Sequence, residues 1–504
     1  MKRGRVLLIN PKMCRPHSVR LPLSLLSLGA VLEGRFDYQI VDGNLDPDPV
    51  GTILTALDRE PHTLAGVTVM PGPQVAPAIE ISAAIRAAHP QTPIAWGGYF
   101  PTLYPNAALN APYVDYVVRE QGELALLDLL DVLPASDAAS LSNVQGISWK
   151  LGGAPVHNPA RDFRTPEDFP LLPYGRLGEL DRYLRPSFMG TRTAVHQCAI
   201  GCRFHCTFCG VVSMFNGYTK SQGVERLEIS LRELRDFGAN SVQYYDHNFF
   251  DSEEASIPIL EVLARFQLPW WCYARADTLA RFSRSTWSLL QKTRFTMAYI
   301  GAEAGSDEAL KRMRKGARVE HTFEVARLCR EYNVIPEFSF VLGGPEDPEG
   351  EIERTLAFVK RLKRVNPQCE IVLYFYSPTP QRDPRWRKAD PNRSAIPVLQ
   401  TYGPEGPDLP ATPEEWTEPR WLNYVCHQDA PWLSPRMRQR VKDFGKVLYC
   451  RFPTVQDYAT PAWGKRLLQT AAAWRYSSSR YGNPWELDVL RRLIPLREPQ
   501  RDSL

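Results

Sequence analysis

The residues most suited to chemistry are three cysteines with the spacing Cys-x3-Cys-x2-Cys, at Cys202, Cys206 and Cys209, with Phe208 just before the last one. Three thiolates on one short loop can hold three irons of a cubane cluster. An electron-carrying [4Fe-4S] cluster normally has four cysteine ligands. The fourth iron would therefore lack a protein ligand and could bind a substrate or cofactor. The spacing predicts an iron–sulfur cluster that takes part in a reaction.

Zinc and disulfide alternatives fit this loop less well. Structural zinc prefers paired Cys-x2-Cys knuckles and four ligands, and although His205 or Cys198 could complete a set, no second knuckle occurs. For Cys198 we expect a buried structural cysteine. No secretory signal is evident, so reduced thiols and a cytoplasmic location are expected. The remaining cysteines are scattered singly: Cys14, Cys272, Cys329, Cys369, Cys426 and Cys450.

The cysteine motif resembles the signature of the radical S-adenosylmethionine (SAM) superfamily. The resemblance implies that the unique iron chelates the amino and carboxylate groups of SAM, and that electron transfer cleaves SAM to a 5'-deoxyadenosyl radical. It also implies a flavodoxin or ferredoxin as electron donor, and it assigns Phe208 to the cofactor site.

Residues 1–135 alternate short apolar segments with helical ones. Strands are expected at 5–10, 38–42, 64–70, 93–98 and 114–119, and helices at 23–32, 50–59, 75–88 and after Gly122. Nearly all-apolar strands separated by helices predict a Rossmann-like, doubly wound parallel sheet. Ligands of such sheets bind at the carboxyl ends of the strands. Neither G-x-G-x-x-G nor a P-loop is present, which disfavours a dinucleotide or ATP site.

Three segments in this region resemble the cobalamin-binding domain that precedes many radical SAM modules: 22–30, 95–102 and 115–123. Gly97 and Gly98 fall at a strand end, where glycine lets a flat ligand approach the backbone, although a tight turn would also require glycine. The Asp-x-His-x-x-Gly motif that donates histidine to cobalt is absent, and 42–46 reads Asp-Gly-Asn-Leu-Asp. We therefore expect cobalt without a protein histidine, His17 being the one credible exception.

A second strand–helix series begins at Thr193. Strands are expected at 193–197, 241–245, 270–274, 297–301, 336–342 and 371–376, with helices at 225–237, 253–266, 283–292, 319–332 and 348–365. Six β/α units predict a partial barrel. The cysteine loop directly follows the first strand, and barrel chemistry belongs at the carboxyl ends of strands. This layout resembles the radical SAM core over 191–384.

Three polar residues stand at the ends of these strands. Asp246 follows the second, Arg275 ends the third and Glu303 ends the fourth. The resemblance assigns all three to cofactor binding, because a carboxylate accepts from a ribose or an α-ammonium group and a guanidinium pairs with a carboxylate. A mutual Arg275–Glu303 ion pair is the structural alternative. No residue is assigned to catalysis itself.

Two further regions complete the expected organisation. Residues 136–190 look like a proline-punctuated linker, and 385–504 like a mainly helical region. The latter holds a basic helical stretch (Arg436, Arg438, Arg440, Lys442, Lys446) that could touch a membrane surface or anionic substrate, although a solvated face is the commoner use. It also holds seven tryptophans, suited to helix packing or to lining an apolar or planar substrate's pocket: Trp386, Trp416, Trp421, Trp432, Trp463, Trp474 and Trp485.

Composition narrows the function further. The 504 residues are 44% hydrophobic and 23% charged, ordinary for a globular protein, and their net charge of +4 is too small to indicate nucleic acid. No apolar run approaches the length that spans a bilayer.

The resemblance as a whole implies a cobalamin-dependent radical SAM enzyme using a [4Fe-4S] cluster, SAM and cobalamin. A C-methyltransferase acting on an unactivated carbon of a small-molecule or natural-product substrate is the expected function. The alternatives are a cyclase or ring-rearranging oxidoreductase that uses cobalamin without net methyl transfer, and a non-catalytic corrinoid or cluster sensor.

Overall fold

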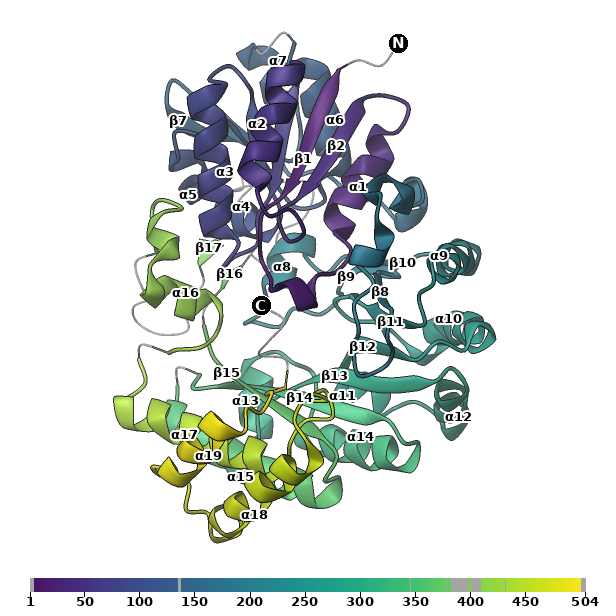
Figure 1. Cartoon of the computed structure of the whole chain (residues 1–504), viewed down its shortest axis with the longest axis vertical. Coiled ribbons are helices and arrows are strands. Elements are labelled where there is room, and N and C mark those ends of the chain that lie inside the picture. Colours follow the sequence, from purple (N-terminus) through teal and green to yellow (C-terminus); the bar gives the residue numbers. More distant parts are fainter. Residues whose placement is uncertain are drawn as a thin grey trace. The chain divides into compact units, whose positions relative to one another are not determined.

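The computed structural model describes residues 4–134, 137–344, 346–377, 379–381, 398–399, 409–430 and 432–499. The chain forms two compact units, each built from several segments of the sequence. Unit 1 contains residues 1–183, 197–233 and 378–426. Unit 2 contains residues 184–196, 234–377 and 427–504. The elements of both are labelled in Figure 1.

Unit 1 is built on a seven-stranded sheet of order β2-β1-β3-β4-β5-β6-β7. The first five strands are parallel, and the last two are antiparallel. The strands are β1 (Arg5–Asn10), β2 (Asp37–Asp42), β3 (Leu64–Thr68), β4 (Ile94–Gly97), β5 (Tyr116–Val118), β6 (Ile147–Leu151) and β7 (Ala154–His157). The helices are α1 (Leu23–Leu32), α2 (Pro49–Arg59), α3 (Val75–Ala88), α4 (Tyr99–Leu103), α5 (Pro105–Asn110), α6 (Gly122–Val132) and α7 (Ala138–Ser142).

Alternation along β1 explains why this sheet is covered on both faces. Side chains of successive strand residues point to opposite faces. Leu7 and Ile9 belong to one core with residues of α2 and α3, and Val6 and Leu8 to another with residues of α1 and α6. All four are completely buried. A run of four apolar residues therefore serves two cores, which confirms the predicted doubly wound sheet (Figure 1).

The interval 136–190 differs from the expected linker because it extends this sheet. Strands β6 and β7 pair antiparallel around Gly152 and Gly153, which have φ of +59° and +85°. Glycine adopts such angles without steric cost, so a Gly-Gly pair suits a two-residue hairpin. The hairpin lies against β5 at the edge of the sheet.

The remaining elements of unit 1 come from two distant parts of the chain. Strands β9 (Ala199–Gly201) and β10 (Thr219–Ser221) form an antiparallel pair, with α8 (Gly210–Phe215) between them. From the C-terminal region come β16 (Pro380–Gln381), β17 (Val398–Leu399) and α16 (Pro419–Val425). Trp416 and Trp421 are buried in the core shared with α2 and α3. These two tryptophans pack on the N-terminal sheet.

Unit 2 contains a six-stranded, wholly parallel sheet of order β15-β14-β13-β12-β11-β8. Its strands are β8 (Thr193–His196), β11 (Ser241–Tyr244), β12 (Trp270–Arg275), β13 (Phe295–Glu303), β14 (Ile335–Leu342) and β15 (Glu370–Phe375). Its helices are α10 (Glu253–Phe266), α11 (Ala276–Leu279), α12 (Arg284–Lys292), α13 (Asp307–Arg312), α14 (Val319–Glu331) and α15 (Pro348–Val365), while α9 (Val224–Asp236) begins in unit 1. This arrangement confirms the predicted partial barrel.

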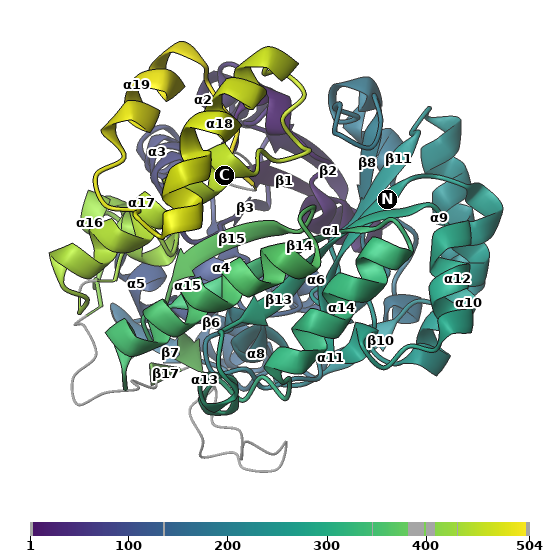
Figure 2. The ribbon, with the colours of Figure 1, turned by 90° about the horizontal axis from the view of Figure 1, so that it is seen from below.

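Local sequence explains why these helices begin where they do. Ser252, Ser283 and Ser306 are the N-caps of α10, α12 and α13, and each hydroxyl accepts a backbone N–H three residues on. Such caps typically contribute about 1 kcal/mol each. Helices α14 and α15 both pack against β14, and Figure 2 shows them side by side.

Three helices close unit 2: α17 (Pro435–Arg451), α18 (Ala462–Ser478) and α19 (Trp485–Leu493). The C-terminal region is helical as predicted, but its helices divide between the units, α16 belonging to unit 1. Trp386 and the expected boundary at 384/385 lie outside the described residues. Within the described part of the chain, no helix is long and apolar enough to cross a membrane.

Candidate active site

The cysteine loop is held between a short hairpin and a short helix in unit 1. Strand β9 leads directly into Cys202, and α8 begins just after Cys209. Gly201 has φ of +71°, and a Cβ there would lie only 2.0 Å from the carbonyl oxygen of Tyr218. The paired strand therefore requires glycine before Cys202. A turn follows, in which the Cys209 N–H donates to the carbonyl of Cys206 at 3.2 Å.

The three cysteines form no disulfide. Cys206 is buried, and Cys202 and Cys209 are half-buried. Among the described residues, no three His, Cys, Asp or Glu side chains are arranged around a single metal ion. A cubane does not need that arrangement, because each thiolate binds a different iron. Cys198 is only 1% exposed, as expected for a structural cysteine.

Tyr99, the first residue of α4, connects the cysteine loop with the end of β4. It directly follows Gly97 and Gly98, and α4 packs against α8. A Cβ on Gly210 would lie 3.8 Å from the Tyr99 ring. Burial raises the pKa of Tyr99 well above its usual range, and the charges of Cys209 and Cys202 raise it further. The structure thus brings the two glycines and the cysteine loop together through a residue that the sequence analysis did not single out.

The two glycines at the end of β4 differ in what the fold requires of them. Gly98 has φ of +99°, and a Cβ there would lie 3.0 Å from the Val69 carbonyl oxygen. A turn explains this glycine. At Gly97 a Cβ would make only ordinary contacts of 3.6 Å with Val118. The fold itself therefore does not require glycine at 97. The prediction that a flat ligand approaches the backbone at this strand end rests on Gly97 alone.

The three histidines within residues 1–135 lie at different edges of the N-terminal sheet, and a cobalt without a protein histidine stays a prediction. His62 Nδ1 lies 2.9 Å from the carbonyl oxygen of Glu60, and His89 Nε2 lies 3.2 Å from Asp58. Both precede strands, at the edge opposite the carboxyl ends. His17 is exposed in the connection after β1, at the carboxyl edge. Of the three histidines within residues 1–135, His17 is the one that follows the carboxyl end of a strand.

Unit 2 gathers the other predicted cofactor residues at the carboxyl ends of its parallel strands. Asp246 follows β11 and is fully buried. Arg275 is the last residue of β12 and is 4% exposed, and Glu303 is the last residue of β13 and is 5% exposed. Arg275 Nε pairs with Asp277 Oδ1 at 3.0 Å, and Lys315 Nζ pairs with Glu303 Oε1 at 2.6 Å. The mutual Arg275–Glu303 pair is therefore not the arrangement seen.

These two buried ion pairs are joined into one network. Arg275 also donates through Nη2 to the backbone carbonyl of Lys315. Glu303 has φ of +63°, an uncommon angle for a residue with a side chain. A backbone angle of this kind tends to occur where the site itself requires it. Sequence reasoning missed Lys315 and Asp277. Only the Arg-x-Asp spacing of 275–277 gave any local signal.

Beside this edge the sheet carries a row of aromatic side chains. The Tyr273 ring centroid lies 4.6 Å from that of Trp271 and 5.3 Å from that of Tyr299, and Tyr245 is 6.3 Å from Tyr273. Trp271 is buried, whereas the three tyrosines are half-buried or exposed. The neighbouring Trp270 faces the opposite side, where its ring stacks on Phe295 at 4.3 Å. The row therefore offers aromatic surface on one face of the sheet.

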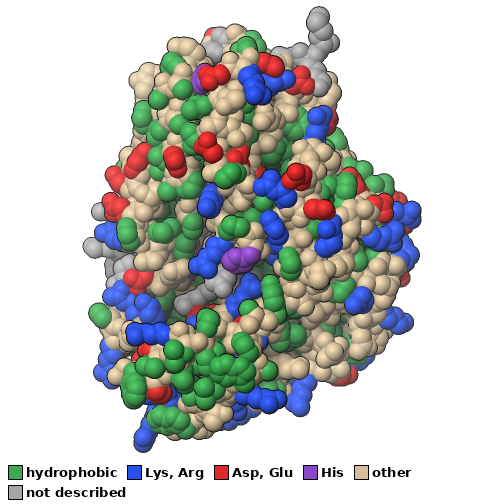
Figure 3. Space-filling model, in the orientation of Figure 1, with side chains coloured by type: hydrophobic (Ala, Val, Ile, Leu, Met, Phe, Trp, Pro, Cys, Tyr) green, Lys and Arg blue, Asp and Glu red, His purple; other side chains and the backbone are tan. Residues whose placement is uncertain are grey.

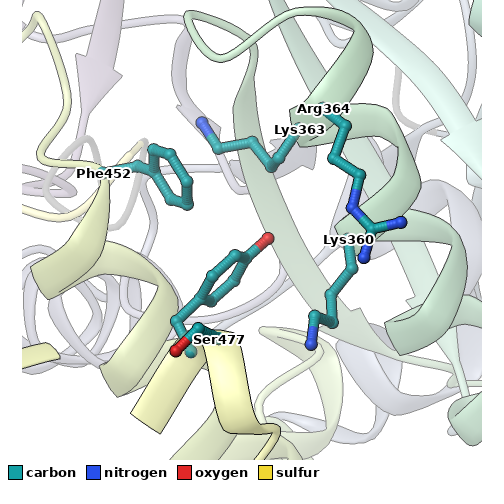
Figure 4. A pocket seen from close by; sticks show the side chains of 6 residues that line it. Lys360, Lys363, Arg364, Phe452 and Ser477 are labelled. Carbon is teal, nitrogen blue, oxygen red and sulfur yellow. The ribbon is translucent and has the colours of Figure 1, made fainter. Parts of the chain in front are cut away.

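A pocket of about 280 Å³ elsewhere in unit 2 contains none of the predicted residues. Figure 4 shows Lys360, Lys363 and Arg364 of α15 around it, opposite Phe452 and α18. Lys363 donates to the carbonyl of Pro367 at 2.8 Å. No carboxylate lines the pocket, so its chemistry favours an anion.

Comparison with known proteins identifies both halves of this arrangement. The Radical SAM superfamily model matches residues 198–359, and the B12 binding domain model matches residues 18–130. This chain is a radical SAM protein with a B12-binding domain. The first match begins just before the cysteine loop and covers β11, β12, β13 and β14 of unit 2. The second covers the parallel strands β2, β3, β4 and β5 of unit 1.

Individual relatives of this radical SAM protein are distant. An uncharacterized methyltransferase of Pyrococcus horikoshii is 23% identical over 346 residues, 68% of this chain and 73% of the relative. An anaerobic magnesium-protoporphyrin IX monomethyl ester cyclase of Synechocystis is 23% identical over 395 residues, 75% of each chain. Other curated relatives match over only about half of their own length. The solved apo structure of OxsB, a cobalamin-dependent SAM radical enzyme, superposes with a TM-score of 0.65 at 19% identity, covering 94% of this chain and 71% of that one.

The cofactors of the radical SAM protein follow from its two domains. They are a [4Fe-4S] cluster and SAM for the radical SAM domain and cobalamin for the B12-binding domain. The residues present fit these groups. Three cysteines that form no disulfide share one loop, and buried charges lie at the strand ends where a zwitterionic cofactor needs partners.

Proposed function

We propose that this radical SAM protein is a C-methyltransferase that acts on an unactivated carbon of a small-molecule or natural-product substrate. The observation that carries the proposal is the junction at Tyr99, where the end of β4 and the cysteine loop share one compact unit. In this family the bound groups supply a carbon-centred radical and a methyl group. The task of the protein is placement and the exclusion of water and oxygen.

Each predicted site residue has a role in this proposal. Cys202, Cys206 and Cys209 ligate three irons, and Phe208 borders the cofactor between the last two thiols. Gly97 leaves the strand end open for the corrin, with Gly98 forming the turn that follows.

The charged residues of unit 2 bind SAM. The Arg275 guanidinium faces the carboxylate of SAM, while Glu303 and Asp246 accept hydrogen bonds from its ribose or ammonium group. Because Glu303 and Arg275 already have buried partners, SAM joins a network whose geometry is fixed before binding. This arrangement reduces the ordering cost of binding.

The aromatic row of β11–β13 supports an apolar or planar substrate. Tyr245, Tyr273 and Tyr299 combine flat apolar faces with hydroxyl groups, which suits a substrate that is mostly apolar and carries a few polar atoms.

We further propose that the protein works in the cytoplasm with flavodoxin or ferredoxin as reductant. The proposal includes no nucleic-acid partner.

Cyclisation or ring rearrangement without methyl transfer is the second candidate, because a cyclase relative matches three quarters of the chain. Incubation of the reduced, cobalamin-loaded protein with methyl-labelled SAM and a cell extract separates the candidates. A labelled metabolite with S-adenosylhomocysteine supports methyl transfer. 5'-Deoxyadenosine with an altered but unlabelled metabolite contradicts it and favours cyclisation. The absence of any SAM turnover would favour a sensor.

A further inference from the structure

The C-terminal helices of unit 2 expose an unusual amount of apolar surface. Eight of the fourteen exposed large hydrophobic side chains in the described chain lie between residues 455 and 493. Three are tryptophans: Trp463, Trp474 and Trp485 are 66%, 51% and 62% exposed. None of the three tryptophans lines the pocket between α15 and α18. Figure 3 shows hydrophobic side chains gathered over this part of unit 2.

Spacing places these side chains in one stripe on each helix. Trp463, Leu467 and Trp474 of α18 are separated by four and seven residues, so they share a helical face. Trp485, Val489 and Leu493 of α19 are each four residues apart, opposite the buried Leu487. We call these six residues the C-terminal apolar face. Contiguous exposed apolar surface of this kind marks an interaction site.

The charge around the C-terminal apolar face is strongly positive. Residues 434–498 contain thirteen Lys and Arg against five Asp and Glu, a net charge of +8 in a chain whose total is +4. Five of the cations are exposed, and none of them is in an ion pair in the described part of the chain: Arg436, Lys442, Arg466, Arg480 and Arg492. Arg466 and Arg492 directly precede Leu467 and Leu493.

The acidic residues of this region are either buried or in ion pairs. Asp443 and Asp457 are buried. Each of the other three is in an ion pair: Glu486 with Arg475, Asp488 with Lys446, and Glu498 with Arg491. The pocket of Figure 4 adds further cations, and one of its walls is Tyr476 and Ser477 of α18. The exposed charge of residues 434–498 that has no ion-pair partner is therefore positive.

We propose that the C-terminal apolar face binds peripherally to a bilayer containing anionic phospholipids. Tryptophan rings and leucines beside arginines are the combination that enters the boundary between headgroups and acyl chains, while the cations contact lipid phosphates. An acidic protein partner would need its own apolar face to match this one. The proposal goes beyond the proposed function and does not depend on it, because binding is measured without turnover.

Vesicle flotation of the full-length protein tests the proposal. The vesicles are phosphatidylcholine alone, or phosphatidylcholine with about one third phosphatidylglycerol, and we expect the anionic vesicles to bind about tenfold more strongly or better. Trp463→Ser combined with Trp485→Ser and Leu493→Ser should lower binding to anionic vesicles at least about tenfold. These side chains are exposed, so the fold should be kept, which circular dichroism checks.

Two comparisons complete the test. The matched control is Leu151→Ser with Ile229→Ser, two side chains that are 52% and 50% exposed in unit 1 and should leave binding unchanged. Arg466→Ala with Arg492→Ala should remove most of the preference for anionic lipid. Wild-type protein that does not float, or a triple variant that floats as well as wild type, overturns the proposal. If the wild-type protein binds no vesicles but self-associates, and the triple variant does not self-associate, the C-terminal apolar face would be assigned to contact with a second copy instead.

Discussion

Glu303→Gln is the substitution that best separates SAM binding from structural support. Glu303 and Lys315 are both 6% exposed and their charged atoms are 2.6 Å apart. Glutamine at 303 can still accept a hydrogen bond from the Lys315 ammonium group, but it leaves the buried positive charge of Lys315 without a negative partner. Removing one partner of a buried pair costs about 3–5 kcal/mol. At about 2–4 °C per kcal/mol, we expect unfolding at least about 6 °C lower.

The double variant Glu303→Gln with Lys315→Met supplies the decisive comparison. It removes both charges, so most of the lost stability should return. If Glu303 accepts hydrogen bonds from SAM, the double variant should still bind SAM about ten- to hundredfold more weakly, since a charge-assisted bond contributes about 1.5–3 kcal/mol.

The assays are thermal unfolding and anaerobic calorimetric titration of SAM. Glu320→Gln is the control, because Glu320 pairs with Arg327 at an exposed site of α14 and should change stability by less than about 1 kcal/mol. A double variant with wild-type SAM affinity would show that Glu303 only balances Lys315, and would refute its assignment to the cofactor.

Three other predictions follow from the geometry. Burial and the neighbouring Glu370 raise the pKa of Glu337 well above 4.5. The folded protein therefore keeps a proton on Glu337 that the unfolded chain releases as pH rises, which lowers stability at high pH. Glu337→Gln should remove this loss, so it should raise the unfolding temperature at pH about 8, and the gain should fade below pH about 4.5. An equal gain at both pH values would contradict this sign. Tyr99→Ala should speed the loss of cluster iron in air by uncovering Cys202 and Cys209, whereas Tyr99→Phe keeps the packing and should match wild type; equal rates in both variants would refute the shielding. We expect cobalamin to bind with its dimethylbenzimidazole displaced and no protein histidine in its place, so electron paramagnetic resonance of the Co(II) form should lack axial nitrogen splitting. Splitting that is lost in His17→Ala would show that His17 is a ligand.

Buried parallel strands were predictable because their sequence pattern is local. Leu7 to Ile9 and Val341 to Leu342 sit in short apolar runs bounded by helical segments, and such runs identify strands covered on both faces. Helices with clear first and last turns, such as α10 and α15, matched their expected limits. The hairpin at Gly152–Gly153 was missed, although the Gly-Gly pair itself was a turn signal.

Contacts between distant residues were not predictable in the same way. Twelve residues separate Glu303 from Lys315, and nothing in the local pattern of either indicates that they pair. Tyr99 carries no motif of its own, and its position beside the cysteine loop depends on how α4 packs against α8. The exposure of Trp463 and Trp485 likewise depends on which face of each helix the fold covers.

The most direct test of the account is 5'-deoxyadenosine formation by anaerobically reconstituted protein supplied with SAM and a reductant. The account predicts about four irons per chain and SAM cleavage in the wild type. Cys202→Ala, Cys206→Ala and Cys209→Ala should each abolish cleavage, while Cys198→Ala, which changes a buried cysteine just before β9, should retain it. Cleavage at the wild-type rate by any one of the three variants would contradict the assignment of the open cluster to this loop.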